Sequence, residues 1–184
     1  MTVFNMIVAC CENSGIGFRN VIPWFIRNDL KYFSQKTRGT TGNNAIVMGR
    51  TTWETIPKRF LPGRKNIVLS KSLTQDDIPD KVRNRITVLS SFQEMLDYFK
   101  EKDFEEVWII GGTSIYEQFY EKYNILINKI LITRIHKEYT CDVFFPDVSK
   151  DFSVKKSDKI TELDTYFVEK PESVEVEYQV LERK

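Results

Sequence analysis

The sequence predicts a single-domain α/β fold around a mostly parallel, mixed β-sheet of about eight strands flanked by helices, and three patterns support this. Six short apolar runs, rich in β-branched residues, are typical of strands buried on both faces of a parallel sheet. Helical patterns lie between most of these runs, as right-handed strand–helix–strand crossovers require. The last part of the chain alternates apolar and polar residues, which predicts an antiparallel C-terminal hairpin with one wetter face.

The individual elements follow from these patterns in chain order. The apolar runs predict strands at residues 3–11, 44–49, 65–70, 85–90, 106–112 and 129–136. Helical spacing predicts helices at residues 27–36, 51–56, 92–101 and 113–121. Ser91, with Glu94 three residues later, has the pattern of a capping box at the start of the third helix. The two strands of the hairpin are predicted around residues 151–158 and 174–184.

The composition excludes several classes of protein. A chain of 184 residues with 41% hydrophobic residues is predicted to form one domain, residues 1–184, with a substantial core. The 27 basic and 26 acidic residues give a net charge of +1, which gives no reason to expect nucleic acid or an anionic membrane as the main partner. No apolar run has the length of a membrane span, and the N-terminus lacks the basic start of a signal peptide. We therefore expect a cytoplasmic monomer.

The cysteine and histidine content argues against a metal site and against a nucleophilic enzyme. Cys10, Cys11 and Cys141 form no even disulfide framework, which indicates a reducing compartment. The two adjacent cysteines point to opposite faces of a strand, so they do not easily share a metal ion. His136 is the single histidine, and no acid is obviously placed in the sequence to orient it.

Asp29 is the most informative residue, because helical spacing places a carboxylate on an apolar stripe. Ile26, Leu30 and Phe33 lie three and four residues apart, and Asp29 falls among them, with Asn28 on the outer side. A carboxylate among apolar neighbours loses hydration unless it has a partner or takes up a proton, and folded chains rarely accept this without a function for it. The alternative is that Asn28 or Asp29 caps the helix and leaves the carboxylate in solvent.

The ends of the predicted strands collect groups that suit a phosphorylated ligand, because ligands of open α/β sheets bind beyond the carboxyl ends of the strands. Gly111 and Gly112 open a helix directly after a strand, where glycines allow a close backbone approach and the helix N-terminus attracts anions. Gly49 and Arg50 repeat this arrangement. Each signal alone is weak, since a double glycine is as often a tight turn and an arginine is usually a solvated surface residue.

Two further segments have both a functional and a structural reading. Arg64 lies on a Pro-Gly turn that enters a strand, where its guanidinium could bind a ligand carboxylate or remain a solvated cation. The connection of residues 12–24 is long and contains two glycines, so it could be a mobile lid over a site or a passive crossover.

The order and spacing of these segments resemble the dihydrofolate reductase family over essentially the whole chain. The matching motifs are Ile7-Val8-Ala9, Gly15-Ile16-Gly17, Ile22-Pro23-Trp24, Asp29-Leu30-Lys31-Tyr32-Phe33, Met48-Gly49-Arg50-Thr51-Thr52-Trp53-Glu54-Thr55-Ile56-Pro57, Leu61-Pro62-Gly63-Arg64-Lys65-Asn66-Ile67-Val68-Leu69-Ser70, Ile110-Gly111-Gly112-Thr113-Ser114-Ile115-Tyr116, Thr133-Arg134-Ile135 and Asp142-Val143-Phe144-Phe145-Pro146.

This resemblance implies an NADPH-dependent reduction of 7,8-dihydrofolate to 5,6,7,8-tetrahydrofolate in one-carbon metabolism, with hydride transfer to C6 and protonation at N5. Asp29 would bind the pterin ring and favour its protonated form, supported by Trp24 and Thr133, while Arg64 would hold the glutamate α-carboxylate. The residues implied in binding the substrate and antifolates such as methotrexate are Ile7, Val8, Ala9, Asp29, Leu30, Phe33, Ile56, Leu61, Arg64, Ile110, Tyr116 and Thr133. The residues implied in binding NADPH are Ala9, Ile16, Gly17, Gly49, Arg50, Thr51, Thr52, Leu69, Ser70, Lys71, Ile110, Gly111, Gly112, Thr113, Ser114, Ile115 and Tyr116. The resemblance also implies a cis peptide bond between Gly111 and Gly112.

Two alternatives remain open at this point. A reductase of the same fold could act on another heterocycle, although Asp29 together with Arg64 suits a pterin ring with a glutamate tail. The chain could also bind folate or NADPH without turnover, although a binding module has no need for a buried acid.

Overall fold

One large β-sheet organises the molecule, which is described over residues 1–184 by a computed structural model. Its eight strands lie in the order β5-β4-β3-β6-β1-β7-β10-β9. The first six strands pair in parallel with one another, and β10 pairs antiparallel with both β7 and β9. The strands of this sheet are β1 (Val3–Cys10), β3 (Ala45–Gly49), β4 (Lys65–Leu69), β5 (Ile86–Leu89), β6 (Glu106–Ile109), β7 (Ile127–Ile135), β9 (Phe152–Asp164) and β10 (Glu172–Arg183). The predicted fold class, including the C-terminal hairpin, is therefore confirmed.

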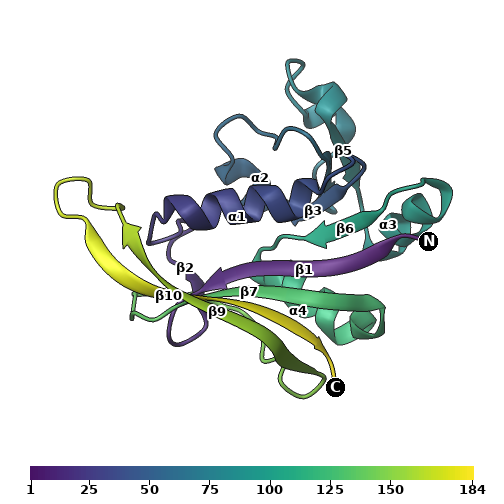
Figure 1. Cartoon of the computed structure of the whole chain (residues 1–184). Helices are drawn as coiled ribbons and strands as arrows, with labels where there is room; N and C mark the ends of the chain where they lie inside the picture. The colour runs from purple at the N-terminus through teal and green to yellow at the C-terminus, as the bar shows by residue number, and fades with distance from the viewer.

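Helices cover both faces of this sheet, as Figure 1 shows, with α1 and α2 on one face and α3 and α4 on the other. The helices are α1 (Arg27–Arg38), α2 (Arg50–Thr55), α3 (Phe92–Glu101) and α4 (Thr113–Tyr123). Short 3₁₀ turns occur at Gln75–Asp77, Arg83–Arg85 and Asn124–Leu126. The larger core cluster joins α3 and α4 to the sheet through side chains such as Met95 and Phe119, while Trp53 of α2 belongs to the cluster on the opposite face.

Some element boundaries differ from the predictions for local reasons. The helix expected from residue 51 begins at Arg50, immediately after the β3 strand. Ser91 caps α3 as predicted, with its hydroxyl accepting from the Glu94 amide at 3.1 Å. Glu94 reaches past the cap, however, and accepts from the backbone and hydroxyl of Ser90 at 2.6 and 2.7 Å. The expected capping box is therefore altered, because the Glu94 carboxylate binds Ser90, one residue before the N-cap residue Ser91.

The sequence patterns missed a small second sheet and the full length of the hairpin. β2 (Gly15–Gly17) pairs with β8 (Val143–Phe144), so a strand lies within the connection expected to be a lid or a crossover. β9 extends to Asp164, six residues beyond the expected end at residue 158. The acids Glu162 and Asp164 are 8% and 6% exposed, whereas Leu163 between them is 49% exposed, which reverses the usual strand pattern. Because of this reversal, the spacing of apolar residues did not predict the last residues of β9.

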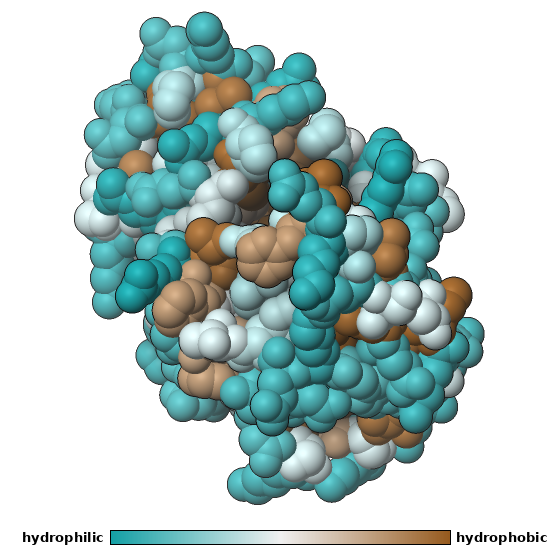
Figure 2. Space-filling model, turned by 90° about the vertical axis from the view of Figure 1, so that its left-hand side faces the viewer, coloured by the Kyte–Doolittle hydropathy of each residue, from teal (hydrophilic) through white to brown (hydrophobic).

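The carboxyl ends of the parallel strands and the start of α1 lie on one side of the molecule, at the left of Figure 1. Figure 2 views the molecule from this side and shows apolar residues exposed in a hollow across the middle of the face, with hydrophilic residues above and below. None of the helices has the length and apolarity needed to cross a membrane.

Candidate active site

Asp29 lies in the first turn of α1, and its carboxylate accepts a hydrogen bond from the Thr133 hydroxyl of β7 at 2.8 Å. The backbone N-cap of the helix is Ile26, which is 2% exposed and makes no side-chain cap. The alternative that Asn28 or Asp29 caps the helix in solvent is therefore wrong. The structure brings together Asp29 and Thr133, two residues that are 104 positions apart in the chain.

The surroundings of Asp29 favour its protonated form. Burial is the main cause and raises the pKa of Asp29 to about 6, from an ordinary value of 3.8. The hydrogen bond from Thr133 opposes this rise, and the negative charge of Glu162 adds to it. A carboxyl group that titrates near neutrality can hold or release a proton at the working pH of an enzyme, which is the property of a general acid or base.

The apolar stripe around Asp29 is narrower than predicted. Ile26 is buried and Phe33 is half-buried, but Leu30 is 47% exposed. The Leu30 side chain is therefore accessible to a ligand instead of packing into the core. Asn28 is exposed, as expected for the outer side, and it donates its side-chain amide to Glu162 of β9 at 2.7 Å.

Most of the apolar residues predicted to contact the substrate line the α1 side of the sheet, and Val8 and Tyr116 are exceptions. Ile7 packs in the cluster on that side, and Phe33, Ile56, Leu61 and Ile110 are partly buried against the same cluster. Ala9 also faces α1, packed against the cluster that contains Trp24. The side chain of Val8 points the other way, into the core beneath α3 and α4, because neighbouring strand residues alternate in direction. Val8 can therefore meet a ligand only through its backbone.

Arg64 is a half-buried cation without an acidic partner. Its guanidinium donates to the Thr37 hydroxyl at 2.8 Å and to the Pro62 carbonyl at 3.0 and 2.8 Å, and none of these hydrogen bonds goes to a carboxylate. Burial, followed by the nearby charge of Arg38, lowers the pKa of Arg64 to about 10. An anion placed on this guanidinium would relieve both effects, so the arrangement suits a ligand carboxylate.

The Gly111-Gly112 segment forms a tight cradle at the start of α4. The peptide bond between these glycines is cis, as the sequence resemblance implied. Gly111 has a φ of 109°, and a Cβ there would lie 2.8 Å from the ring of Tyr116, whose hydroxyl donates to the Ile7 carbonyl at 2.7 Å. A Cβ at Gly112 would meet only the Thr52 hydroxyl, at 3.3 Å. Gly111 is thus the position where the backbone most strictly requires glycine.

One polar atom in this cradle has no partner within the protein. The Thr113 hydroxyl, at the first position of α4, is buried and makes no hydrogen bond. Nearby, the Gly49 amide donates to the Gly111 carbonyl at 2.8 Å, and a Cβ at Gly49 would lie 3.0 Å from Ile115. An orphaned hydroxyl beside glycines at a helix N-terminus fits an anionic group such as a pyrophosphate.

Polar side chains converge where β3 and β4 end. Arg50 donates to Glu54 at 2.8 Å and to Ser72 at 3.2 Å, and the hydroxyls of Ser70 and Ser72 are 3.5 Å apart. Lys71 between them is exposed. Arg50 and Ser72 border a surface hollow of about 430 Å³. The sequence reading included Arg50, Ser70 and Lys71 but missed Ser72, although its place two residues after Ser70 was a usable signal.

The remaining predicted cofactor residues occupy the same edge in different environments. Leu69 is 7% exposed at the end of β4, and Ile16 packs partly buried against the larger core cluster. Gly17 has Val143 at 3.2 Å from a Cβ position, so β8 restricts it. Thr51 is exposed, and the Ser114 hydroxyl accepts from Gln118 at 2.6 Å. These residues surround the cradle, but none of them shows a comparable unsatisfied group.

Trp24 and Asp164 fix the chain that leads into α1. Trp24 is 5% exposed and packs against Tyr139, with ring centroids 5.1 Å apart. Asp164 accepts from the Phe25 amide at 3.0 Å and from the Tyr139 hydroxyl at 2.6 Å. The end of β9 therefore fixes the segment that precedes α1, and this segment positions Asp29 in the site.

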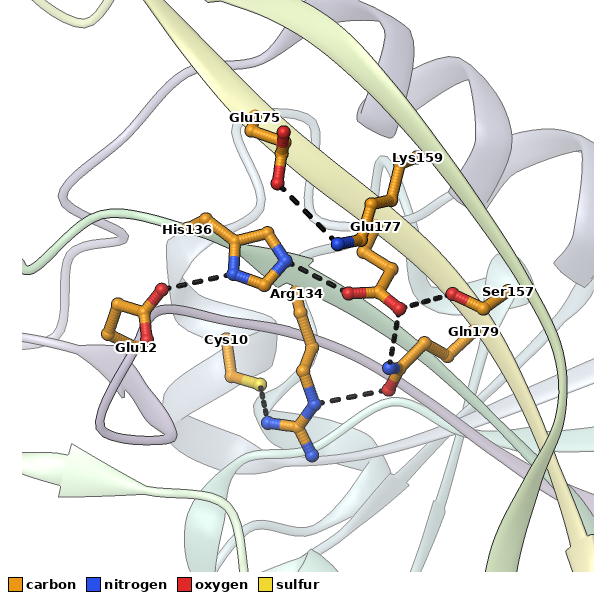
Figure 3. A network of polar contacts seen from close by, with 9 residues as sticks. All are labelled: Cys10, Glu12, Arg134, His136, Ser157, Lys159, Glu175, Glu177 and Gln179. Atoms are coloured by element: carbon orange, nitrogen blue, oxygen red, sulfur yellow. Dashed lines mark hydrogen bonds and ion pairs between the residues drawn. The ribbon is translucent and has the colours of Figure 1, made fainter.

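A second polar network occupies the opposite face of the same strands, as Figure 3 shows. The His136 ring lies 3.0 Å from Glu12 and 2.9 Å from Glu177, so the prediction that no acid orients it is wrong. These two contacts raise the pKa of His136, and the Ser157 hydroxyl is the main cause that lowers the pKa of Glu177 to about 2. No group of three or more His, Cys, Asp or Glu side chains gathers as metal ligands.

Comparison with known proteins gives one consistent result. A family model described as dihydrofolate reductase matches residues 3–181. The dihydrofolate reductase of Drosophila melanogaster is 38% identical over 191 residues, covering 100% of this chain and 99% of its own length. That of Aedes albopictus is 34% identical over 192 residues, covering 100% and 98%. That of Gallus gallus is 37% identical over 158 residues, covering 82% of each chain.

Proposed function

The chain belongs to the dihydrofolate reductase family, and from this premise we propose that Asp29 is its catalytic carboxylate and that NADPH is its cofactor. The protein is an enzyme that reduces dihydrofolate to tetrahydrofolate. The observation that supports the role of Asp29 is its burial beside Thr133 with a pKa raised to about 6. A binding module without turnover has no need for such a group, so this observation favours catalysis.

The proposed work of the protein residues is to bind the pterin ring and to support its protonation at N5. Asp29 accepts hydrogen bonds from the ring and favours its protonated form, and Thr133 holds the carboxylate in place. Ile7, Phe33 and Ile56 pack against the ring and exclude water, which strengthens the electrostatic effect of Asp29. We assign a similar packing role to Leu30 and Leu61.

Arg64 is proposed to bind the α-carboxylate of the glutamate tail. Its half-buried guanidinium has no acidic partner within the protein, and a planar fork of N–H donors matches a carboxylate. The combination of an acid for the ring and a cation for the tail favours folate over a heterocycle without a carboxylate side chain.

A nicotinamide cofactor follows from the family, and the residues of the Gly111-Gly112 cradle fit its pyrophosphate. When bound, the reduced nicotinamide supplies the hydride. The unpartnered Thr113 hydroxyl and the start of α4 would hold the pyrophosphate. The choice of NADPH is supported by Arg50, Ser70, Lys71 and Ser72, which gather cationic and hydroxyl groups suitable for a 2′-phosphate.

The direct test is a spectrophotometric assay of the purified chain. Absorbance of the reduced nicotinamide should fall when dihydrofolate and NADPH are both present, and should stay constant when dihydrofolate is omitted. Binding of both compounds without any absorbance change would support the non-catalytic alternative. Oxidation with another heterocycle but not with dihydrofolate would contradict the proposed substrate.

The choice of cofactor has its own test. Arg50→Ala should weaken NADPH binding by about 10-fold or more and barely change NADH binding, because charged hydrogen bonds contribute about 1.5–3 kcal/mol. Titration calorimetry with both cofactors measures this. Equal affinities of the unmodified protein for NADH and NADPH would contradict the proposed phosphate pocket.

A further inference from the structure

A second buried carboxylate, Glu162, lies beside the site and is not used in the function described above. Glu162 belongs to β9 and is 8% exposed. It accepts a hydrogen bond from the Asn28 side-chain amide at 2.7 Å and from the Tyr178 hydroxyl at 3.4 Å. Both partners are neutral, so the charge of Glu162 is hydrogen-bonded but not compensated.

The partners of Glu162 connect it to Asp29 from two directions. Asn28 precedes Asp29 in the first turn of α1, so one hydrogen bond reaches the backbone that carries the catalytic acid. Tyr178 lies directly opposite Thr133 in the β10–β7 pairing, and Thr133 donates to Asp29. Glu162 is therefore linked to Asp29 through α1 and through the β10–β7 pairing.

No cation pairs directly with Asp29 or Glu162, although Lys36 lies 5.5 Å from the centre of the Tyr32 ring. Tyr32 of α1 packs on Tyr178 of β10 with ring centroids 4.6 Å apart, and Asp158 of β9 pairs with Tyr178 in the strand register. β7 contributes the Thr133 hydroxyl. None of the ion pairs in the structure involves Asp29 or Glu162. Asp29 and Glu162 thus share a wall with two phenols, an amide and a hydroxyl, whereas the third acid, Asp158, forms an ion pair with Lys156 at 3.6 Å.

We propose that Glu162 is a positioning residue for the reduction, which orients the start of α1 through Asn28 and uses its negative charge to keep a proton available at Asp29. This inference rests on the proposed role of Asp29. A negative neighbour favours the neutral form of a carboxyl group and equally favours a positive charge on a bound pterin. Glu162 would therefore extend protonation of the site toward higher pH.

The raised pKa of Asp29 agrees with this geometry. Burial contributes most to its raised pKa, and the charge of Glu162 is the second cause that acts in the same direction. Glu162→Gln removes the charge and keeps the size and an acceptor for Asn28. The pKa of Asp29 should then fall by about half a unit or more, and Glu162→Asp should retain most of the effect.

The first experiment measures the pKa of Asp29 without any ligand. The ¹³C signal of the Asp29 carboxyl carbon, assigned by its loss in Asp29→Asn, is titrated by NMR in the unmodified protein, Glu162→Gln, Glu162→Asp and Glu169→Gln. Glu169 is an exposed acid of the same hairpin and serves as the matched control. A lower Asp29 pKa in Glu162→Gln alone supports the proposal, and an unchanged pKa in that variant overturns it.

A second readout is needed if Glu162→Gln does not fold. In the unmodified protein, the titration curve of the Asp29 signal should be broader than that of an isolated carboxyl group, because interacting acids titrate as a pair. A single transition of ordinary width at Asp29 would overturn the proposal without any variant.

The kinetic consequence separates this proposal from the assignment of function. With dihydrofolate and NADPH, Glu162→Gln should lower the turnover rate by about 3- to 10-fold at pH 8 and change it little at pH 5, which corresponds to a shift of about half to one pH unit. An equal loss at both pH values would indicate a purely structural role and overturn the proposal. Absence of dihydrofolate reduction in the unmodified protein would contradict the function, while the ligand-free NMR titration would still test the coupling of the two acids.

Discussion

The strands β7 and β10 carry two polar networks, one on each face. The two networks differ in whether neighbouring groups stabilise the negative charge of their acids. On the face toward α1, Asp29 meets the hydroxyl of Thr133, and no cation is near. On the opposite face, Glu177 contacts His136 at 2.9 Å and shares a network with Arg134 through Gln179 (Figure 3). Adjacent residues of one strand therefore support opposite electrostatic environments, because side chains alternate between faces.

The difference shows which charges the fold satisfies by itself. The pKa of Glu177 is lowered to about 2, mainly by the Ser157 hydroxyl, so its ionised form is stabilised within the protein. The pKa of Asp29 is raised to about 6, so its ionised form is penalised. A compensated acid contributes to stability, whereas an uncompensated acid costs stability and is retained for chemistry.

The largest expected effect comes from neutralising one acid on each face. Asp29→Asn should lower turnover with dihydrofolate by about 10²–10⁴-fold, which is the usual contribution of acid–base assistance, and the loss should shrink at low pH. Glu177→Gln should leave turnover within about 3-fold of the unmodified enzyme, because its network faces away from the site. Steady-state kinetics of both variants test this, and equal losses would show that the two faces do not differ in function.

Arg64 extends the comparison to a cation that has no acidic partner within the protein. Arg64→Leu should weaken dihydrofolate and methotrexate binding by about 2–4 kcal/mol, the range for removing one partner of a desolvated charge pair. A pteridine without the glutamate tail should bind nearly unchanged. Fluorescence titration with tailed and tailless ligands measures the difference. Similar losses for both would mean that Arg64 supports the fold through Thr37 and Pro62 instead.

Stability should respond to the same two acids with opposite signs. The folded-state pKa of Asp29 lies above its ordinary value, so ionisation destabilises the folded protein above about pH 6, and the penalty vanishes below about pH 4. Asp29→Asn should therefore raise the free energy of unfolding at pH 8 by about 1–2 kcal/mol, after allowance for solvent screening, and have no effect at pH 3.

Glu177 gives the reverse case for the same measurement. Its lowered pKa stabilises the folded protein above about pH 4.5, and this contribution is lost as the pH falls through about 2. Glu177→Gln should reduce the free energy of unfolding by about 1 kcal/mol at pH 8. Urea unfolding of both variants at pH 8 checks the signs, and a destabilised Asp29→Asn would refute the argument from burial.

Arg50 differs from Arg64, because Arg50 forms an ion pair with Glu54 and is nevertheless proposed to bind a phosphate. If the exposed ion pair competes with the cofactor, Glu54→Gln should tighten NADPH binding by about 2- to 5-fold at low salt and leave NADH binding unchanged, since exposed pairs contribute at most about 1 kcal/mol. The gain should disappear as salt rises. Weaker NADPH binding in this variant would show that Glu54 positions Arg50 instead of competing for it.

Sequence patterns predicted the strands and helices that carry the site better than the charges and hydrogen bonds around Asp29. Buried parallel strands have nearly continuous apolar runs, so their ends, and with them Gly49 and Gly111, could be located from periodicity and glycine spacing. Asp29 was found because a helix with apolar spacing contained an acid. These features are local, and local patterns are what a sequence displays directly.

The partners of Asp29 could not be found from local patterns. Glu162 is 134 residues from Asn28, and β9 buries its acids while exposing Leu163. His136 likewise contacts two acids from other strands, 124 and 41 residues away. Such pairings depend on strand order and register, which the alternation of a single strand does not specify.

The position of β10 between β7 and β9 determines when the active site can form during synthesis of the chain. β10 follows all other strands along the chain but fills an interior place in the sheet, so β9 cannot join the sheet until β10 has been synthesised. Tyr178 and the register that brings Glu162 toward α1 are therefore missing from a nascent chain that has already made Asp29 and Thr133. The catalytic pocket is completed only after β10 has been synthesised, as a late, long-range step of folding.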